Sequence, residues 1–329
     1  MGPCSKLSMP TKSDFKHKVK RCNVNTVKKC RLVLSSLPVL LAVLFLNSVS
    51  VAADPGKNGK IAFQANYTGS VQIYTVNPDG ADLFQVTNLP AANDIFAMWP
   101  DFSPDGKQIV FPHDMTGALE LYVVNPDGTN LTQITHDGRF HLAPHWSPDG
   151  THIVFGTAGK YGLGVIGTIR ADGTDFRMLT TPVWEALAGE YTADGRHIIF
   201  TTQQDGYVSA LWIMNTDGKH LRRLSDPRLT ASIPDVSPDG EQVVFNDKQN
   251  FPGLSSIFKM NLQDNTVIRL TSPERNAGLP VFSPDGKKLL FVSDQASPGS
   301  LDTWVMDADG SHQRLLIKGG AAENWGVQP

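Results

Sequence analysis

The chain has 329 residues, of which 40% are hydrophobic and only 19% are charged, with 29 glycines and 22 prolines. This composition excludes a disordered or coiled-coil protein and favours many short strands joined by tight turns. The formal net charge is −3, and this modest value combines a basic N-terminal segment with an acidic body, whose charge would oppose binding to nucleic-acid phosphates.

The first 53 residues differ from the rest. Nine of the ten charged residues up to Arg31 are basic, and an apolar run over residues 32–46 is followed by small residues that end at Ala52-Ala53. A basic segment, a short apolar core and a small-residue end are typical of an export signal, so we expect cleavage after Ala52 or Ala53. The alternative is an uncleaved membrane anchor, but this run is shorter than the ~20 apolar residues that span a bilayer comfortably.

Removal of this segment changes the charge of the protein. It leaves 20 basic and 31 acidic residues, a net charge of −11, and it removes all three cysteines (Cys4, Cys22 and Cys30). The remaining body can have neither a disulfide nor a thiolate site. We therefore expect a periplasmic or secreted monomer that binds no nucleic acid and meets a membrane only if the signal is retained.

One ten-residue phrase recurs through the body of the chain. It begins with an aromatic or apolar residue, continues with a Ser-Pro-Asp-Gly-like turn, and closes on a phenylalanine. The five clear copies cover residues 102–111, 146–155, 191–200, 236–245 and 282–291, and a degenerate copy covers residues 58–63. Because Pro, Asp and Gly suit successive turn positions, each copy predicts a β-hairpin.

A second hairpin follows in every repeat. Its turn contains an Asp-Gly pair in five copies and Asp264-Asn265 in the other, and Asn also tolerates a positive φ. Each repeat of about 45 residues therefore predicts four antiparallel strands, and radial stacking buries both faces of such sheets. We predict an all-β, six-bladed propeller over residues 54–329. The expected blades are 54–96 with 323–329, 97–140, 141–185, 186–230, 231–276 and 277–322.

The C-terminus should complete the first blade, since the N-terminal copy begins at its second strand. We align Pro329 with Pro100 and Pro144, which leaves the chain without the aromatic residue that follows in the other copies.

These repeats resemble those of the TolB-like β-propeller family, whose PD40-type units carry the same Ser-Pro-Asp-Gly signature followed by an Asp-Gly hairpin. The resemblance covers residues 54–329 and implies an extracytoplasmic protein-binding module. TolB has an N-terminal α/β domain, for which this sequence leaves no room before the first repeat. Related propellers precede the hydrolase domain of prolyl oligopeptidases, but no Gly-x-Ser-x-Gly motif is present. Others are pectin-fragment lyases with a histidine-held metal.

A variable position precedes the aromatic residue of each repeat, and it should face the central channel. Its occupants are Asp101, His145, Glu190, Asp235 and Val281. Such groups can gather a divalent cation or a polar ligand, or they can bond a neighbouring blade. A second cluster contains His136, His141 and His145. Taken together with the variable channel position, it gives His141, His145 and Glu190 as the candidate metal ligands.

Tryptophans mark the loops that we expect to enter the innermost strands, namely Trp99, Trp184 and Trp325. Trp is a frequent interface anchor, so these residues are candidates for partner binding, with plugging of blade junctions as the alternative. We expect a non-catalytic module that binds an envelope or extracellular protein or peptide and has no resident cofactor. The alternative is a metal-assisted lyase or hydrolase acting on an extracellular glycan.

Overall fold

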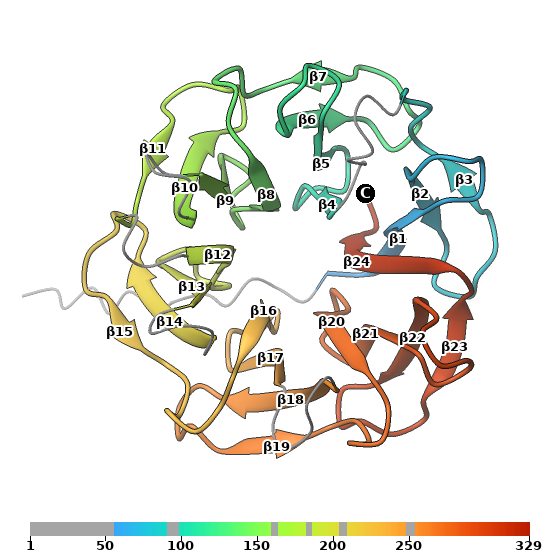
Figure 1. Cartoon of the computed structure of the whole chain (residues 1–329), viewed down its shortest axis with the longest axis vertical. Helices are drawn as coiled ribbons and strands as arrows, with labels where there is room; N and C mark the ends of the chain where they lie inside the picture. Colours follow the sequence, from blue (N-terminus) through green and yellow to red (C-terminus); the bar gives the residue numbers. More distant parts are fainter. Residues whose placement is uncertain (1–55, 91–98, 159–163, 182–185, 204–208, 248–253) are drawn as a thin grey trace, which may run out of the picture. The chain divides into compact units, whose positions relative to one another are not determined.

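The computed structural model describes residues 56–90, 99–158, 164–181, 186–203, 209–247 and 254–329. These residues form six four-stranded antiparallel sheets arranged around a central axis (Figure 1). The predicted six-bladed β-propeller is therefore confirmed. Within the same ranges, no helix is long and apolar enough to cross a bilayer.

The blades are numbered along the chain, and each is given from its innermost to its outermost strand. Blade 1 contains β24 (Gly320–Val327), β1 (Asn58–Ala65), β2 (Gln72–Val76) and β3 (Phe84–Gln85). Blade 2 contains β4 (Asp101–Phe102), β5 (Ile109–His113), β6 (Glu120–Val124) and β7 (Thr132–Gln133). Blade 3 contains β8 (His141–Trp146), β9 (His152–Ala158), β10 (Gly164–Arg170) and β11 (Arg177–Met178).

The remaining three blades follow the same order. Blade 4 contains β12 (Ala186–Tyr191), β13 (His197–Thr202), β14 (Ala210–Asn215) and β15 (Arg222–Arg223). Blade 5 contains β16 (Ser232–Val236), β17 (Gln242–Asp247), β18 (Ser256–Asn261) and β19 (Val267–Arg269). Blade 6 contains β20 (Ala277–Phe282), β21 (Lys288–Ser293), β22 (Asp302–Asp307) and β23 (Arg314–Ile317).

The phenylalanine that closes each repeat occupies the centre of its blade. All six are fully buried, and they are Phe63, Phe111, Phe155, Phe200, Phe245 and Phe291. Each lies on the second strand of its sheet, where it packs against a residue of the third strand. Phe245, for example, stacks on Phe258 with ring centroids 6.0 Å apart. One large aromatic side chain per repeat therefore anchors each blade in the core.

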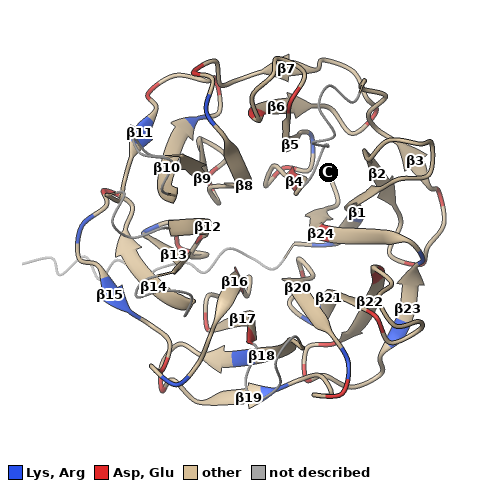
Figure 2. Cartoon of the chain, in the orientation of Figure 1, with Lys and Arg blue, Asp and Glu red and all other residues tan. Residues whose placement is uncertain are grey.

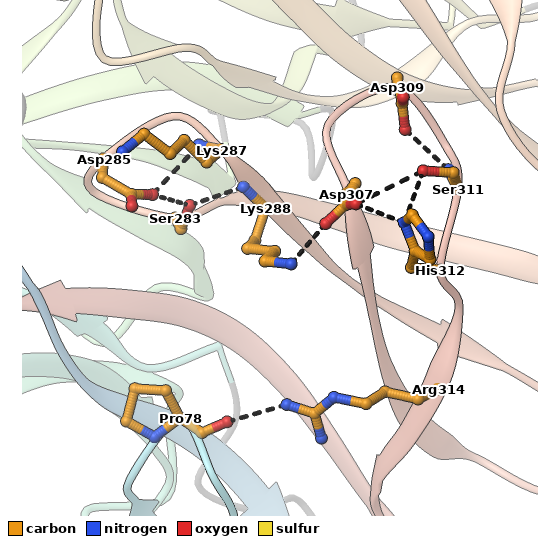
Figure 3. Close-up of polar contacts among 10 residues, drawn as sticks. All are labelled: Pro78, Ser283, Asp285, Lys287, Lys288, Asp307, Asp309, Ser311, His312 and Arg314. Atoms are coloured by element: carbon orange, nitrogen blue, oxygen red, sulfur yellow. Dashed lines mark hydrogen bonds and ion pairs between the residues drawn. The ribbon is translucent and has the colours of Figure 1, made fainter.

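The turn that joins the first two strands is built from its own side chains (Figure 3). In blade 6 the Ser283 hydroxyl donates to Asp285 at 2.6 Å, and it accepts from the Lys288 amide at 2.9 Å. Gly286 adopts a φ of 70°, which a residue with a side chain resists. The same turn recurs in the other four blades that carry the phrase, so the repeat encodes its own hairpin.

The second hairpin turn packs against the preceding blade. A side chain at Gly218 would place its Cβ 2.6 Å from the Leu179 carbonyl oxygen, and one at Gly173 would lie 2.8 Å from that of Ile134. Glycine is therefore required both for its positive φ and for this close approach. Asn265, the exception, has a φ of 58°, as expected from its tolerance of the left-handed region.

The innermost strands are irregular at one shared place. The register shifts by one residue in five of the six inner strands, which is the mark of a β-bulge. Trp99, Ala143, Ile233 and Leu279, at matching positions before the variable residue, have positive φ values between 44° and 53°. The proline that follows each of them lacks an amide hydrogen, which suits a position where the ladder is interrupted.

The C-terminal strand β24 completes blade 1 by pairing with β1. The register places Trp325 opposite Ile61 and Asn324 opposite Ala62. Trp325 therefore holds the aromatic position of the repeat, and the expected alignment of Pro329 with Pro100 is wrong. The chain instead continues past the aromatic position, where the Gln328 amide donates to the Lys57 carbonyl at 2.8 Å.

The central phenylalanines predict a large stability cost on truncation. Phe245→Ala removes a fully buried ring, so we expect a loss of about 3–5 kcal/mol in the free energy of unfolding. Urea denaturation followed by tryptophan fluorescence measures it. Ile268→Ala, at a side chain that is 52% exposed, is the control and should change stability by less than ~0.5 kcal/mol. Equal unfolding midpoints for the two variants would contradict this packing account.

Candidate functional site

Six equivalent residues line one level of the channel, one from each inner strand. They are Asp101, His145, Glu190, Asp235, Val281 and Asn324, and each pairs with the matching residue of the second strand in its blade. The sequence analysis identified the first five. It missed Asn324 because the C-terminal strand carries no Ser-Pro-Asp-Gly turn by which to align it.

Three of these residues join neighbouring blades. Asp101 accepts a hydrogen bond from the backbone amide of Trp146 in the next blade at 2.8 Å. Asp235 accepts from the amide of Phe282 at 2.8 Å, and the Asn324 side chain accepts from the amide of Phe102 at 3.1 Å. A side-chain acceptor on one blade thus satisfies a backbone donor on the following blade, which is a structural role.

His145 and Glu190 depart from that pattern. His145 Nδ1 lies 2.9 Å from a carboxylate oxygen of Glu190 and 3.7 Å from one of Asp101. Asp101 in turn accepts a hydrogen bond from the Asn324 amide group. The side chains of His145 and Glu190 are 22% and 18% exposed, so the pair borders the channel. These two residues form an ion pair across blades 3 and 4.

The electrostatics of this level follow from burial and from the excess of carboxylates. Burial alone would lower the pKa of His145, but the negative charges of Glu190 and Asp101 outweigh it and raise that pKa well above its usual value. Burial raises the pKa of Glu190, although the His145 charge opposes the shift. Burial and the nearby Glu190 charge raise the pKa of Asp235 well above the usual range.

An apolar cavity of about 170 Å³ lies against this level, lined by the bulged parts of the inner strands. Its walls include Trp99, Leu142, Leu187, Ile233 and Leu279, with His145 and Asp235 as charged members of the lining. The left-handed bulge residues of four blades line the cavity, so the bulges and the cavity occupy the same part of the inner strands.

Glu323 is the remaining polar residue of the cavity wall. It occupies the place that Pro100, Pro234 and Pro280 hold in other blades, and it is only 7% exposed. Neither carboxylate oxygen has a hydrogen-bond partner of good geometry among the described residues. Burial raises the pKa of Glu323 to about 8, and the Trp99 backbone amide and the His145 charge offset only part of that effect. Glu323 lies within β24, as does Trp325, which we expected in a loop that enters an innermost strand.

The inner strands carry acidic side chains and no Lys or Arg. Asp101, Glu190, Asp235 and Glu323 are their four carboxylates, and basic residues lie instead on outer strands such as β11, β15, β19 and β23 (Figure 2). The channel therefore holds an excess of potentially negative groups over the single His145 imidazolium. In a region of low dielectric, such an excess favours a bound cation.

His141 belongs to a different cluster from His145. The ligand atoms of His141, Glu120 and Asp137 lie within 4.8 Å of one another, and this is the one group of three potential metal ligands among the described residues. His141 Nε2 lies 3.0 Å from Asp137 Oδ1. The three metal candidates therefore do not share one site. Glu190 pairs with His145, whereas His141 lies in the cluster with Glu120 and Asp137.

The Glu120 cluster also has a structural explanation. The Glu120 carboxylate accepts hydrogen bonds from the Gly138 amide at 2.7 Å and from the Thr135 hydroxyl at 2.5 Å. Gln72 in blade 1 accepts from the Leu89 amide at 3.0 Å, and it occupies the matching place at the start of the third strand. The carboxylate of Glu120 thus fixes a loop, as the amide of Gln72 does.

The three tryptophans lie in different settings. Trp99 is half-buried and lines the cavity, which places it where a partner can reach it. Trp325 is 6% exposed, packs in a hydrophobic cluster shared by blades 1 and 6, and donates its indole hydrogen to the Gly59 carbonyl at 3.2 Å. It therefore plugs a blade junction. Trp184 lies outside the described residues.

A family model and several solved structures resemble this chain. The family model described as the TolB beta propeller domain, PD40, matches residues 91–251. No curated protein matches the sequence.

Among solved structures, TolB from Acinetobacter baumannii is 20% identical with a TM-score of 0.69, covering 82% of this chain and 67% of that one. A putative TolB from Agrobacterium tumefaciens is 21% identical with a TM-score of 0.64, covering 81% and 93%. An oligogalacturonate lyase from Vibrio parahaemolyticus is 14% identical with a TM-score of 0.56, covering 80% and 77%. At these identities the solved structures share the fold alone.

The His145–Glu190 pair predicts a titration behaviour. The pKa of His145 should lie well above the ordinary ~6.5, because the Glu190 and Asp101 charges outweigh the effect of burial. Glu190→Gln removes the nearest negative charge and should lower that pKa, which NMR titration of the imidazole nitrogens measures. His141, whose ring lies against Asp137 and Glu120 instead, serves as the internal control. A His145 pKa at or below ~6.5 in the unmodified protein would contradict the ion pair.

Proposed function

Given that this chain is a TolB-like β-propeller built from PD40-type repeats, we propose that it is an exported, non-catalytic module that binds another protein or a peptide outside the cytoplasm. The binding surface is the end of the channel bordered by Trp99 and the bulged inner strands. The export signal expected over residues 1–53 supports the location, and the family resemblance supports the class of partner.

One observation carries the proposal. The inner strands of several blades converge on an apolar cavity whose lining includes the half-buried Trp99 and three ionisable side chains, His145, Asp235 and Glu323. Apolar walls with a few polar groups are the usual composition of a ligand site. A rigid ring supports these residues, which keeps the ordering cost of binding low. The partner would insert one side chain or chain end here and contact the surrounding face.

The alternative is a metal-assisted lyase or hydrolase that acts on an extracellular glycan. It is favoured by the fold shared with an oligogalacturonate lyase and by the cluster of Glu120, Asp137 and His141. The channel supports it less well. A histidine must be neutral to bind a metal, whereas the two carboxylates next to His145 favour the protonated ring. We therefore place the binding module first.

The proposal predicts the effect of truncating Trp99. Trp99→Ala removes an aromatic anchor from the cavity, and the expected loss is about 2 kcal/mol of binding free energy, or roughly 30-fold in affinity. Pull-down from an envelope extract identifies the partner, and titration of that partner measures the affinity of each variant.

The matched control is Ile268→Ala on β19, which is the outermost strand of blade 5 and the one farthest from the channel in the order of strands. It should bind the partner with unchanged affinity. Thermal unfolding verifies that both variants are folded. Unchanged affinity in Trp99→Ala, with the fold intact, would exclude this end of the channel as the binding surface.

A further inference from the structure

The cavity combines apolar walls with a buried carboxylate, an arrangement that costs free energy when no ligand is bound. Its walls are largely apolar, with leucines, isoleucine and prolines from the inner strands. Glu323 nevertheless presents a buried carboxylate that has no hydrogen bond of good geometry among the described residues, and the Trp99 backbone amide offsets only part of the cost of its burial. Buried polar groups are almost always paired, because an unpaired one loses its hydration without compensation. An unpaired carboxylate in an apolar wall therefore indicates a missing donor or cation.

The charges around the cavity specify the sign of that missing group. Glu323 and Asp235 both line the cavity, and Glu190 contacts His145. No Lys or Arg occurs on the inner strands. The His145 ring is already shared between Glu190 and Asp101. A cation in the cavity would compensate the remaining carboxylates, whereas an anion would add to the repulsion.

The spacing of these groups specifies the size of the cation. Among the described residues, the channel carboxylates are not part of any trio of ligand atoms close enough to hold a bare metal ion. The cavity of about 170 Å³ is instead comparable to the ~150 Å³ cavity that accepts a benzene molecule. The apolar walls match a hydrocarbon stem, and Trp99 offers an aromatic surface to a cation.

We propose that this cavity binds an ammonium group carried on a short apolar stem, presented by a peptide as a lysine side chain, with Glu323 and Asp235 as the counter-charges. This assignment rests on the proposed function and names the chemical group that the partner inserts. A lysine stem has four methylenes that pack on Leu142, Leu187 and Leu279, while its ammonium group donates to the Glu323 carboxylate.

Ionisation of Glu323 couples binding to protons. With a pKa of about 8, the carboxyl is mostly protonated at pH 7, and a bound ammonium favours its ionised form. A lysine-like amine, with a pKa of ~10.4, stays charged throughout this range. Binding at pH 7 should therefore release a proton, and affinity should rise with pH until the Glu323 carboxyl is ionised before binding.

Calorimetric titration of the purified protein with n-butylammonium chloride tests the proposal. We expect binding that is at least tenfold tighter than that of n-butanol, the neutral analogue of similar shape. The observed heat should differ between phosphate and HEPES buffers at pH 7, because the released proton is taken up by buffers of different ionisation enthalpy and neither buffer is a primary ammonium ion. Equal binding of the amine and the alcohol would overturn the proposal.

Two variants locate the site. Glu323→Gln keeps the shape of the side chain but removes its charge, so it should weaken n-butylammonium binding at least tenfold and reduce the buffer dependence. Asp235→Asn should weaken binding as well, and it covers the case in which Glu323→Gln does not fold. Ile268→Ala on β19 is the control with unchanged binding. Unchanged binding in a folded Glu323→Gln variant would contradict the assignment.

A competition experiment with peptides identifies the source of the ammonium group. An acetylated Gly-Lys-Gly peptide should compete with n-butylammonium, whereas the same peptide with norleucine in place of lysine should not. Failure of the lysine peptide to compete would overturn its assignment as the source. The proposed function fails separately: if Trp99→Ala weakens partner binding but n-butylammonium does not bind, the binding face stands and the ammonium assignment falls.

Discussion

The channel exists because the last strand of the chain pairs with the first. β24 lies antiparallel to β1, with Trp325 opposite Ile61, and this register brings Glu323 and Asn324 into the innermost layer of strands. The indole of Trp325 then bonds the Gly59 carbonyl within the hydrophobic cluster shared by blades 1 and 6. A ring closed in this way has few exposed edges, and its inner strands are held on a common axis. The geometry of every channel residue depends on that pairing.

Within the closed ring, structural and functional roles separate at one level of the inner strands. Asp101, Asp235 and Asn324 bond the backbone of the following blade and so hold adjacent sheets together. His145 and Glu190 bond each other instead, and Glu323 has no hydrogen bond of good geometry among the described residues. Departures from a repeated structural pattern mark the places where a sequence serves something other than the fold. Glu323, the first of the two proposed counter-charges, lies at such a departure, whereas Asp235 keeps the structural hydrogen bond to Phe282 and also lines the cavity.

Much of the fold could be predicted from the sequence, because each repeat encodes its own turns and its own buried phenylalanine. The positive φ of Asn265 was also predictable from the tolerance of Asn for that region. The closing strand was harder, since β24 has no Ser-Pro-Asp-Gly turn and its bulge shifts the register. The dipeptide Asn324-Trp325 resembles Asp101-Phe102, and an alignment on that pair would have given the correct register.

The candidate site was predictable only in part. The variable position followed from the repeat, but the separation of His141 from His145 depends on strand direction and bulges that no spacing in the sequence reveals. Glu323 was missed as a site residue for a related reason. Its importance comes from burial without a partner, which depends on the packing of the inner strands of several blades at once.

Photo-crosslinking in the cells that produce the protein tests the central claim most directly, namely that the cavity end of the channel is the binding surface. The photoreactive residue p-benzoylphenylalanine would replace Leu142 at the cavity wall or, as the reference, Ile268 on the outer strand β19. The account predicts a specific protein adduct from position 142 and none from position 268. An adduct from position 268 alone, with both variants folded, would contradict it.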